Sequence, residues 1–320
     1  MHRALRAADA DSWMLTAQAT RGDERVITPR GLRRLWQRAA LPIDQLPGRL
    51  AGAVGFTSGW TPAGLPGRVA ALGAEIVHLH WTVGMAAVHE LPQLRRPLVW
   101  TLHDLWPLTG GCHYPGTCAG FTAACGHCPL LRGDYAHDLS WRIRRHKAGY
   151  WADVPLAFVA PSRWMAEQIR RSSLFGGHQV SVIPYGFDLQ VFRPQVRAAA
   201  RAHLGLPPER KIVLFGAIRA EADPRKGFDL LQAAVAHLAH NAAADTIDLA
   251  LFGSHAPPPE LGLPVHNFGP IGMMRNWRNC MPPPMCLWRP RVRIICRIPW
   301  PKPWPVARHV SPLRSAASPT

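Results

Sequence analysis

The sequence is short of acidic residues and of long apolar runs. Its 320 residues include 37 Lys and Arg but only 20 Asp and Glu, which gives a formal net charge of +17. No apolar run reaches the roughly 18–20 residues of a membrane-spanning helix, and a polar, alanine-rich stretch rather than a secretory signal follows Met1. Repeats of solenoid period are also absent. These absences favour a globular, cytoplasmic protein over a membrane, secreted or repeat protein.

The shortage of acidic residues is most severe at the C-terminus. Residues 273–320 contain eight Arg and one Lys but no Asp or Glu, together with ten of the 32 Pro and three of the seven Cys. The segment has no apolar period of helix or strand type, so we expect it to be irregular. This segment supplies +9 of the net charge of +17, so much of the positive charge is confined to it. We therefore expect no nucleic-acid partner, and a basic nucleic-acid-binding protein is only a third alternative.

A shifted reading frame accounts for the composition of this tail. The third base of each codon can be read with the first two bases of the next. Met and Trp each have a single codon, so five pairs of adjacent residues that contain one of them determine a single amino acid in the shifted frame. Met273 and Met274, for example, give Asp. With permitted choices at degenerate bases, the reading continues to Thr320 and contains N-T-V-A-E-A-L-A-C-G-T-P. We therefore interpret residues 273–320 as the result of a one-base deletion near Gly272.

The rest of the chain alternates apolar runs with helix-like stretches, which predicts an α/β protein with parallel sheets. The expected strands are Ser12–Thr16, Glu75–His80, Leu98–Leu102, Leu156–Ala160, Val180–Pro184, Lys211–Gly216, Asp248–Gly253 and Val265–Phe268. The expected helices are Arg3–Ala8, Val83–Leu91, Trp141–Tyr150, Arg163–Arg171 with Ser162 as its N-cap, and one that ends near Ala239. The length suffices for two domains with cores of their own.

The stretch from Leu98 to Cys128 carries the strongest signal. Its apolar run stops at His103 and Asp104 and enters a loop rich in Gly, Pro and Cys. A buried parallel strand delivers polar side chains to the carboxyl edge of a sheet in this way, and ligands bind at that edge.

The sequence of this stretch, W-T-L-H-D-L-W-P-L-T-G-G-C-H-Y, resembles a segment in the acceptor-side domain of family-4 glycosyltransferases, especially those of the colanic-acid type in bacterial exopolysaccharide synthesis. The run Y-G-F-D-L-Q-V-F-R-P resembles the connection between the two domains of that family, with Tyr185 in place of the usual Asn. The resemblance implies a GT-B fold of two Rossmann-like domains. It places the acceptor-side domain at 1–186, without its first strand and Gly-rich loop, a partial nucleotide-sugar domain at 187–272, and the out-of-frame tail at 273–320.

The resemblance also implies a reaction. It predicts a retaining transferase that moves a sugar from a nucleotide-diphospho-sugar to a lipid-linked saccharide without a catalytic metal, at the inner face of the cell membrane. Because the chain looks truncated and frameshifted, we expect it to be inactive as written. A non-catalytic pseudoenzyme or binding remnant is the alternative.

Acceptor-side residues follow from the same match. His103 stands where the family has a catalytic histidine, which as a neutral imidazole can bind a sugar hydroxyl or help to move the acceptor's proton; a polar cap on the strand is the plainer interpretation. His80 is a second candidate for the cleft, or else a packed sheet-edge histidine. Asp104 is expected to orient the loop, and Gly110 and Gly111 to line the cleft.

Donor-side residues are expected near the start of a helix in the second domain. Arg225 and Lys226 precede Gly227, and basic side chains at a helix N-terminus suit a diphosphate. Lys226 matches the family's Lys. At the position of the family's Arg this sequence has Ala217, so Arg219 or Arg225 would have to take the role of that Arg. A solvated charge pair is the alternative.

Two further features leave alternatives open. Four cysteines within 17 residues suggest a structural zinc site, packed free thiols or redox pairs: Cys112, Cys118, Cys125 and Cys128, with His113 and His127 nearby. The basic stretch Trp141–Lys147 could contact anionic lipid, which would make the protein a peripheral membrane protein, or could simply be solvated.

Overall fold

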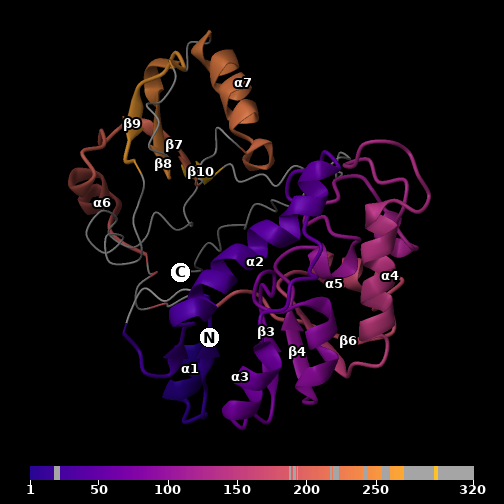
Figure 1. The fold of residues 1–320 in the computed structure, drawn as a ribbon. Helices are drawn as coiled ribbons and strands as arrows, with labels where there is room; N and C mark the ends of the chain where they lie inside the picture. The colour runs from indigo at the N-terminus through magenta and orange to yellow at the C-terminus, as the bar shows by residue number, and fades with distance from the viewer. Residues whose placement is uncertain are drawn as a thin grey trace, which may run out of the picture. The chain divides into compact units, whose positions relative to one another are not determined.

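The structure is a computed structural model, and it describes residues 1–17, 22–186, 189, 192, 194–216, 218, 223–240, 244–253, 260–269 and 292–294. The chain divides into two compact units, residues 1–186 and residues 187–320. Both are α/β units with parallel sheets, as expected (Figure 1). Each is described by itself below.

The first unit is built on a parallel sheet with the strand order β3-β4-β5-β6. These strands are Val77–Leu79, Leu98–Thr101, Leu156–Ala160 and Gln179–Val182. A separate parallel pair joins β1 (Met14–Leu15) to β2 (Val26–Ile27). All five strands expected in this region are present, each at the expected place or within a few residues of it.

Five helices accompany these strands in the described part of the first unit. They are α1 (His2–Ala7), α2 (Gly31–Leu50), α3 (Leu65–Ala71), α4 (Leu139–Trp151) and α5 (Arg163–Arg171). Ser162 caps α5 as predicted, because its hydroxyl accepts a hydrogen bond from the backbone N–H of Met165 at 3.1 Å. Sequence analysis missed α2 and α3. Pro42 and Pro47 lie inside α2, and proline ordinarily argues against a helix interior.

The expected helix at Val83–Leu91 is wrong. The segment holds only a short 3-10 helix at Val88–Glu90, followed by another at Pro92–Leu94. The buried carboxylate of Glu90 accepts hydrogen bonds from the backbone N–H groups of Ala63, Gly64 and Ala87, at 2.7–3.0 Å. A carboxylate shared with a distant loop in this way holds the segment in a tight turn, which explains why its apolar residues do not continue as an α-helix.

The core of the first unit is aromatic. Trp100 on β4 meets Trp151 of α4 edge-on at 5.4 Å between ring centroids, and it stacks on Phe158 of β5 at 6.4 Å. All three side chains are at most 2 % exposed. Burial of such large rings supplies much of the hydrophobic stabilisation of a domain, and it holds the carboxyl end of β4, where the candidate site begins, on a rigid base.

The second unit has a parallel sheet with the order β10-β7-β8-β9. Its strands are Val292–Ile294, Lys211–Gly216, Ile247–Phe252 and Val265–Asn267, and its helices are α6 (Arg197–His203) and α7 (Phe228–Ala239). One face of the sheet packs on α7 through Leu231, Val235 and Leu249. We expected the tail 273–320 to be irregular, but its three described residues form β10, which pairs with β7. The rest of the tail lies outside the described residues. Within the part of the chain that is described, no helix is long and apolar enough to cross a membrane.

Candidate functional site

Three histidines gather at the carboxyl ends of the neighbouring strands β3 and β4. His78 and His80 alternate along the end of β3, so both project from the same face of the sheet, and their rings stack with centroids 4.4 Å apart. The ring of His103, just after β4, stacks on His80 at 5.2 Å. His78 also bonds to the hydroxyl of Thr101 at 2.8 Å. The topology thus brings together two histidines that were singled out from the sequence and a third, His78, that was not.

Tyr185 completes a hydrogen-bonded chain with two of these rings. Its hydroxyl lies 2.7 Å from Nδ1 of His103, whose Nε2 lies 2.9 Å from Nδ1 of His80. The tyrosine ring also stacks on His103, nearly parallel, at 5.6 Å. Tyr185 is the residue that departs from the family pattern. The sequence contained the departure but no sign that it would meet His103.

Burial and mutual repulsion keep this cluster uncharged near neutral pH. Burial, and then the neighbouring His78 and His103, lower the pKa of His80 to about 4. Burial also lowers the pKa of His103, although Asp104 opposes the change, and it raises the pKa of Tyr185. Closely stacked imidazoles cannot all carry a proton at little cost. The cluster therefore offers neutral ring nitrogens, which can accept hydrogen bonds or protons.

The titration of His80 provides a test that needs no activity. In the His103→Ala variant, we expect the pKa of His80 to rise from about 4, because one repelling neighbour has gone. It should stay below 6.5, because burial is the larger cause. An NMR pH titration of the imidazole protons measures this. The His146 signal serves as a control, because its pKa is lowered by burial, His89 and Lys147 rather than by His103; an unchanged His80 would contradict the coupling.

Asp104 holds the loop that follows His103. One of its oxygens accepts the backbone N–H of Trp106 at 3.0 Å, and the other lies 2.7 Å from Nδ1 of the buried His113. The remaining nitrogen of His113 meets the hydroxyl of Thr57 at 3.0 Å, and the indole N–H of Trp106 donates to the Thr57 carbonyl at 2.8 Å. Both oxygens of Asp104 are thus used inside the protein, and its role in orienting the loop stays a prediction.

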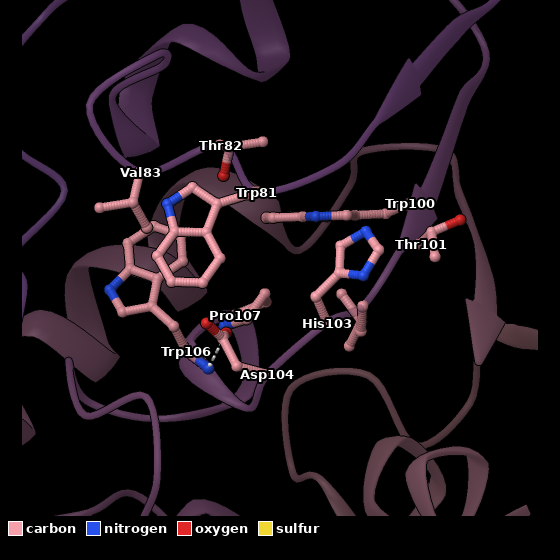
Figure 2. A pocket seen from close by; sticks show the side chains of 10 residues that line it. Trp81, Thr82, Val83, Trp100, Thr101, His103, Asp104, Trp106 and Pro107 are labelled. Carbon is pink, nitrogen blue, oxygen red and sulfur yellow. Dashed lines mark hydrogen bonds between the residues drawn. The ribbon is translucent and has the colours of Figure 1, made fainter. Parts of the chain in front are cut away.

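A pocket opens where this loop meets the ends of β3 and β4 (Figure 2). Its lining includes His103, Asp104 and three tryptophans, Trp81, Trp100 and Trp106. Trp81 is 51 % exposed and lies nearly parallel to His113 at 5.3 Å. It therefore presents an aromatic ring, supported on one face, beside the imidazole of His103. The sequence analysis did not single out Trp81.

Gly110 and Gly111 have a packing reason to be glycines. A Cβ on Gly110 would lie 2.1 Å from the carbonyl oxygen of Ser140 in α4, and one on Gly111 would lie 2.4 Å from the ring of Phe56. Gly111 also has a φ of +125°, which L-residues rarely adopt. Both are buried and do not contribute to the pocket lining. Their role in lining a cleft stays a prediction.

Lys147 is a buried cation directly beneath the loop. Its ammonium donates to the carbonyl oxygens of Trp106 and Thr109, the latter at 3.0 Å, and lies 3.8 Å from the centroid of the Trp106 ring. The side chain is fully buried, and burial lowers its pKa to about 7. Arg144 is buried too and donates to the hydroxyl of Ser173 at 2.6 Å. The basic stretch of α4 is therefore not a uniformly solvated or lipid-facing surface: two of its cations point into the protein.

The depressed pKa of Lys147 predicts a pH-dependent stability. The folded pKa of about 7 lies below the ordinary 10.5, so the unfolded chain binds more protons between these values and stability rises with pH. From pH 7 to 8.5, we expect the free energy of unfolding to rise by roughly 1.5 kcal/mol on account of this one group. Lys147→Met should remove that rise. Denaturant unfolding followed by tryptophan fluorescence measures it, with Arg145→Met, at an exposed position of the same helix, as the control that keeps the slope.

The four cysteines are free thiols, and Cys118, Cys125 and Cys128 each help to raise the pKa of Cys112. Cys112 and Cys128 belong to a small apolar cluster with Ala53, Phe56 and Ile143, whereas Cys125 packs against the main core. Burial raises the pKa of Cys112 to about 12 and that of Cys125 to about 11. Across the described residues, no three His, Cys, Asp or Glu side chains come together so as to hold a metal ion. A structural zinc at these cysteines therefore stays a prediction, as do packed free thiols and redox pairs.

The donor-side residues lie in the second unit. Arg225 makes two hydrogen bonds of 2.7 Å to the carboxylate of Asp223, and these bonds lower the pKa of that carboxyl. Lys226 is exposed beside Gly227, which has a φ of +70° and caps the 12-residue helix α7. The donor-binding role of Arg225, Lys226 and Gly227 stays a prediction. Arg219 lies outside the described residues.

Comparison with known proteins places this site in a family. Residues 7–191 match the model of Glycosyltransferase Family 4. The chain is 29 % identical over 126 residues to the "Putative colanic acid biosynthesis glycosyl transferase WcaC" of Escherichia coli K12, covering 36 % of this chain and 30 % of that one. It is 33 % identical over 169 residues to the D-inositol 3-phosphate glycosyltransferase of Nocardia farcinica, covering 51 % and 32 %.

Two parallel α/β units, with a histidine cluster at the strand ends of the first, are consistent with the GT-B type of transferase fold. The chain belongs to glycosyltransferase family 4. It spans about a third of the length of the curated relatives described above.

Proposed function

We propose that this chain derives from a retaining glycosyltransferase that moves a sugar from a nucleotide-diphospho-sugar to a lipid-linked saccharide in exopolysaccharide synthesis. One observation carries the proposal: the neutral chain Tyr185–His103–His80 at the edge of the sheet, beside the exposed ring of Trp81. Family membership and the similarity to WcaC support it.

Each member of the site has a task in that reaction. Glycosyl transfer needs an acceptor hydroxyl that loses its proton and a sugar held by its own hydroxyls. His103 can serve either need through a ring nitrogen, by exchanging one of its present partners for the substrate. Tyr185 and His80 hold the ring in one orientation, and Trp81 offers a face for the apolar side of a sugar ring.

The leaving diphosphate requires positive charge. In this proposal, Lys226 and the N-terminus of α7 supply it, without a catalytic metal. Arg225 already pairs with Asp223, and we expect that pairing to order the turn before Gly227 so that the backbone N–H groups face the phosphates.

The relatives suggest a second acceptor. Several are named for D-inositol 3-phosphate, among them the enzyme of Kineococcus radiotolerans, which is 30 % identical over 203 residues, 62 % of this chain and 40 % of that one. A small phosphorylated polyol would use the same hydroxyl-binding nitrogens. It is the alternative acceptor for this chain.

A screen for nucleotide release tests the proposal and separates the two acceptors. The protein is a frame-restored chain, in which the residues after Gly272 are those of the shifted frame. It is incubated with a panel of nucleotide-diphospho-sugars and either a polyprenyl-diphosphate-linked saccharide or D-inositol 3-phosphate. We expect release above background with one donor and the lipid-linked acceptor. Release that depends on D-inositol 3-phosphate would establish the alternative, and no release with any pair would count against a transferase.

A further inference from the structure

The pocket at the ends of β3 and β4 is lined by aromatic and polar groups and presents no basic side chain. Its described lining includes three tryptophans and two threonines but no Lys or Arg, and its one carboxylate is that of Asp104 (Figure 2). A site that binds an anion normally offers it Arg, Lys or the N-terminus of a helix. Among the described residues, the pocket therefore lacks the groups that receive a carboxylate or a phosphate.

The charge of Asp104 acts on the groups that a substrate in this pocket would meet. The residue is 8 % exposed. Its charge helps to raise the pKa of Tyr185, and it opposes the lowering of the pKa of His103. Both effects have the sign of a negative potential at the hydrogen-bonding groups of the site. A second anion bound beside them would be repelled by the same potential.

Lys147 offsets this charge only in part. Its ammonium interacts with Asp104, but burial lowers its pKa to about 7, so it is partly deprotonated near neutral pH. The side chain is fully buried and donates to the carbonyl oxygens of Trp106 and Thr109. The amine is thus used inside the protein, and an anion in the pocket would not contact it.

The indole of Trp81 has the same preference as the carboxylate. One of its faces is backed by the ring of His113, which is nearly parallel to it at 5.3 Å and which Asp104 and Thr57 hold in place. The face of an aromatic ring is the negative part of its quadrupole. Such a face attracts the C–H groups of a pyranose ring and repels a negatively charged substituent.

We propose that this pocket selects an uncharged glycosyl residue of the acceptor, without a carboxylate, a phosphate or an acidic ketal, and that Trp81 and Asp104 make the selection. The inference rests on the proposed function, because it names the acceptor class for the same site. A neutral ring nitrogen of His103 suffices to bind a hydroxyl of such a residue. D-inositol 3-phosphate, in contrast, would bring its phosphate into the field of Asp104.

Ligand binding to the full chain as translated tests the inference without any sugar transfer. The probes are methyl β-D-glucoside, methyl β-D-glucuronide and D-inositol 3-phosphate. The first two differ only at C6, which carries a hydroxyl in one and a carboxylate in the other. NMR titration at pH 7.5 follows the indole N–H signal of Trp81 and the imidazole signals of His103. We expect the glucoside to bind about fivefold or more tightly than either anion, because the site repels like charge.

Trp81→Lys should reverse this preference. The substitution removes the stacking face and adds a cation at a position that is 51 % exposed, so the glucuronide should bind about fivefold or more tightly than the glucoside. The signals of His103 report binding in this variant. Trp13→Lys is the matched control, because Trp13 is 42 % exposed and is not part of the pocket lining. It makes the same change of charge and should keep the preference of the wild type.

Three results would overturn the inference: binding of either anion to the wild type as tightly as the glucoside, binding of none of the three probes, or a reversed preference in Trp13→Lys. The proposed function fails by a different result, the absence of transfer by the frame-restored chain with any donor and acceptor, which leaves the binding preference intact. Transfer to a charged acceptor would overturn the inference and leave the transferase assignment in place.

Discussion

Restoring the shifted reading frame after Gly272, together with the expected first strand and Gly-rich loop, is expected to raise sugar transfer by about three orders of magnitude over the chain as it stands. Residues 273–320 as translated contain no Asp or Glu. Under the frameshift hypothesis, the shifted frame would contain an acidic residue and a Glu separated by seven residues, which the resemblance to the family implies would hold the donor's sugar and ribose. Removing one preorganised electrostatic group from a transferase-type site costs roughly 10²–10³ in rate. If the frameshift hypothesis holds, we expect the loss of such a pair to leave the translated chain inactive.

Nucleotide release and sugar transfer should be measured side by side for the two chains. The coding DNA around codon 272 provides an independent check, because the shifted frame must stay open through the codons of residues 273–320. Stop codons in that frame, or robust turnover by the chain as translated, would contradict the frameshift interpretation.

Replacing His103 with alanine in the frame-restored chain should lower kcat/KM by about 10²-fold or more. His103 is the one ring of the cluster that both lines the pocket and meets Tyr185. A positioned acid or base contributes roughly 10²–10⁴. Because burial lowers the pKa of His103 from 6.5, the imidazole is neutral at pH 7, and kcat/KM should fall on the acid side only below pH 6.5.

Tyr185→Phe is the matched variant for this experiment. It removes the 2.7 Å hydrogen bond to His103 but keeps the stacked ring, so we expect a loss of about tenfold, smaller than that of His103→Ala. Nucleotide-sugar titration should show unchanged donor affinity for Tyr185→Phe. An unaffected His103→Ala enzyme would remove His103 from the site.

The location of the site could be predicted from sequence because strand ends are local features. The run L-V-W-T-L followed by His103 and Asp104 contains both the strand and its stop, and the structure places β4 at Leu98–Thr101. The partnership of His103 with Tyr185 could not be predicted, because the two residues are 82 positions apart and meet only through the fold of the first unit.

Lys147 and α2 show a second limit of structure prediction from the sequence. In R-I-R-R-H-K, nothing in the spacing tells which cation points inward; packing of α4 under the loop decides that Lys147 does. The 20-residue helix α2 was missed because it contains two prolines, whose local propensity disfavours a helix. The tertiary packing of Gln37, Ala40, Asp44 and Gly48 stabilises the helix nevertheless.

The mass of the acceptor after incubation tests the account most directly. The frame-restored chain, its preferred nucleotide-diphospho-sugar and the lipid-linked saccharide are combined, and acceptor and nucleotide are quantified by mass spectrometry. We predict that the acceptor gains the mass of one glycosyl residue for each nucleoside diphosphate released, and that His103→Ala abolishes most of both. Nucleotide release without any gain in acceptor mass would contradict the proposal that this chain derives from a glycosyltransferase acting on that acceptor.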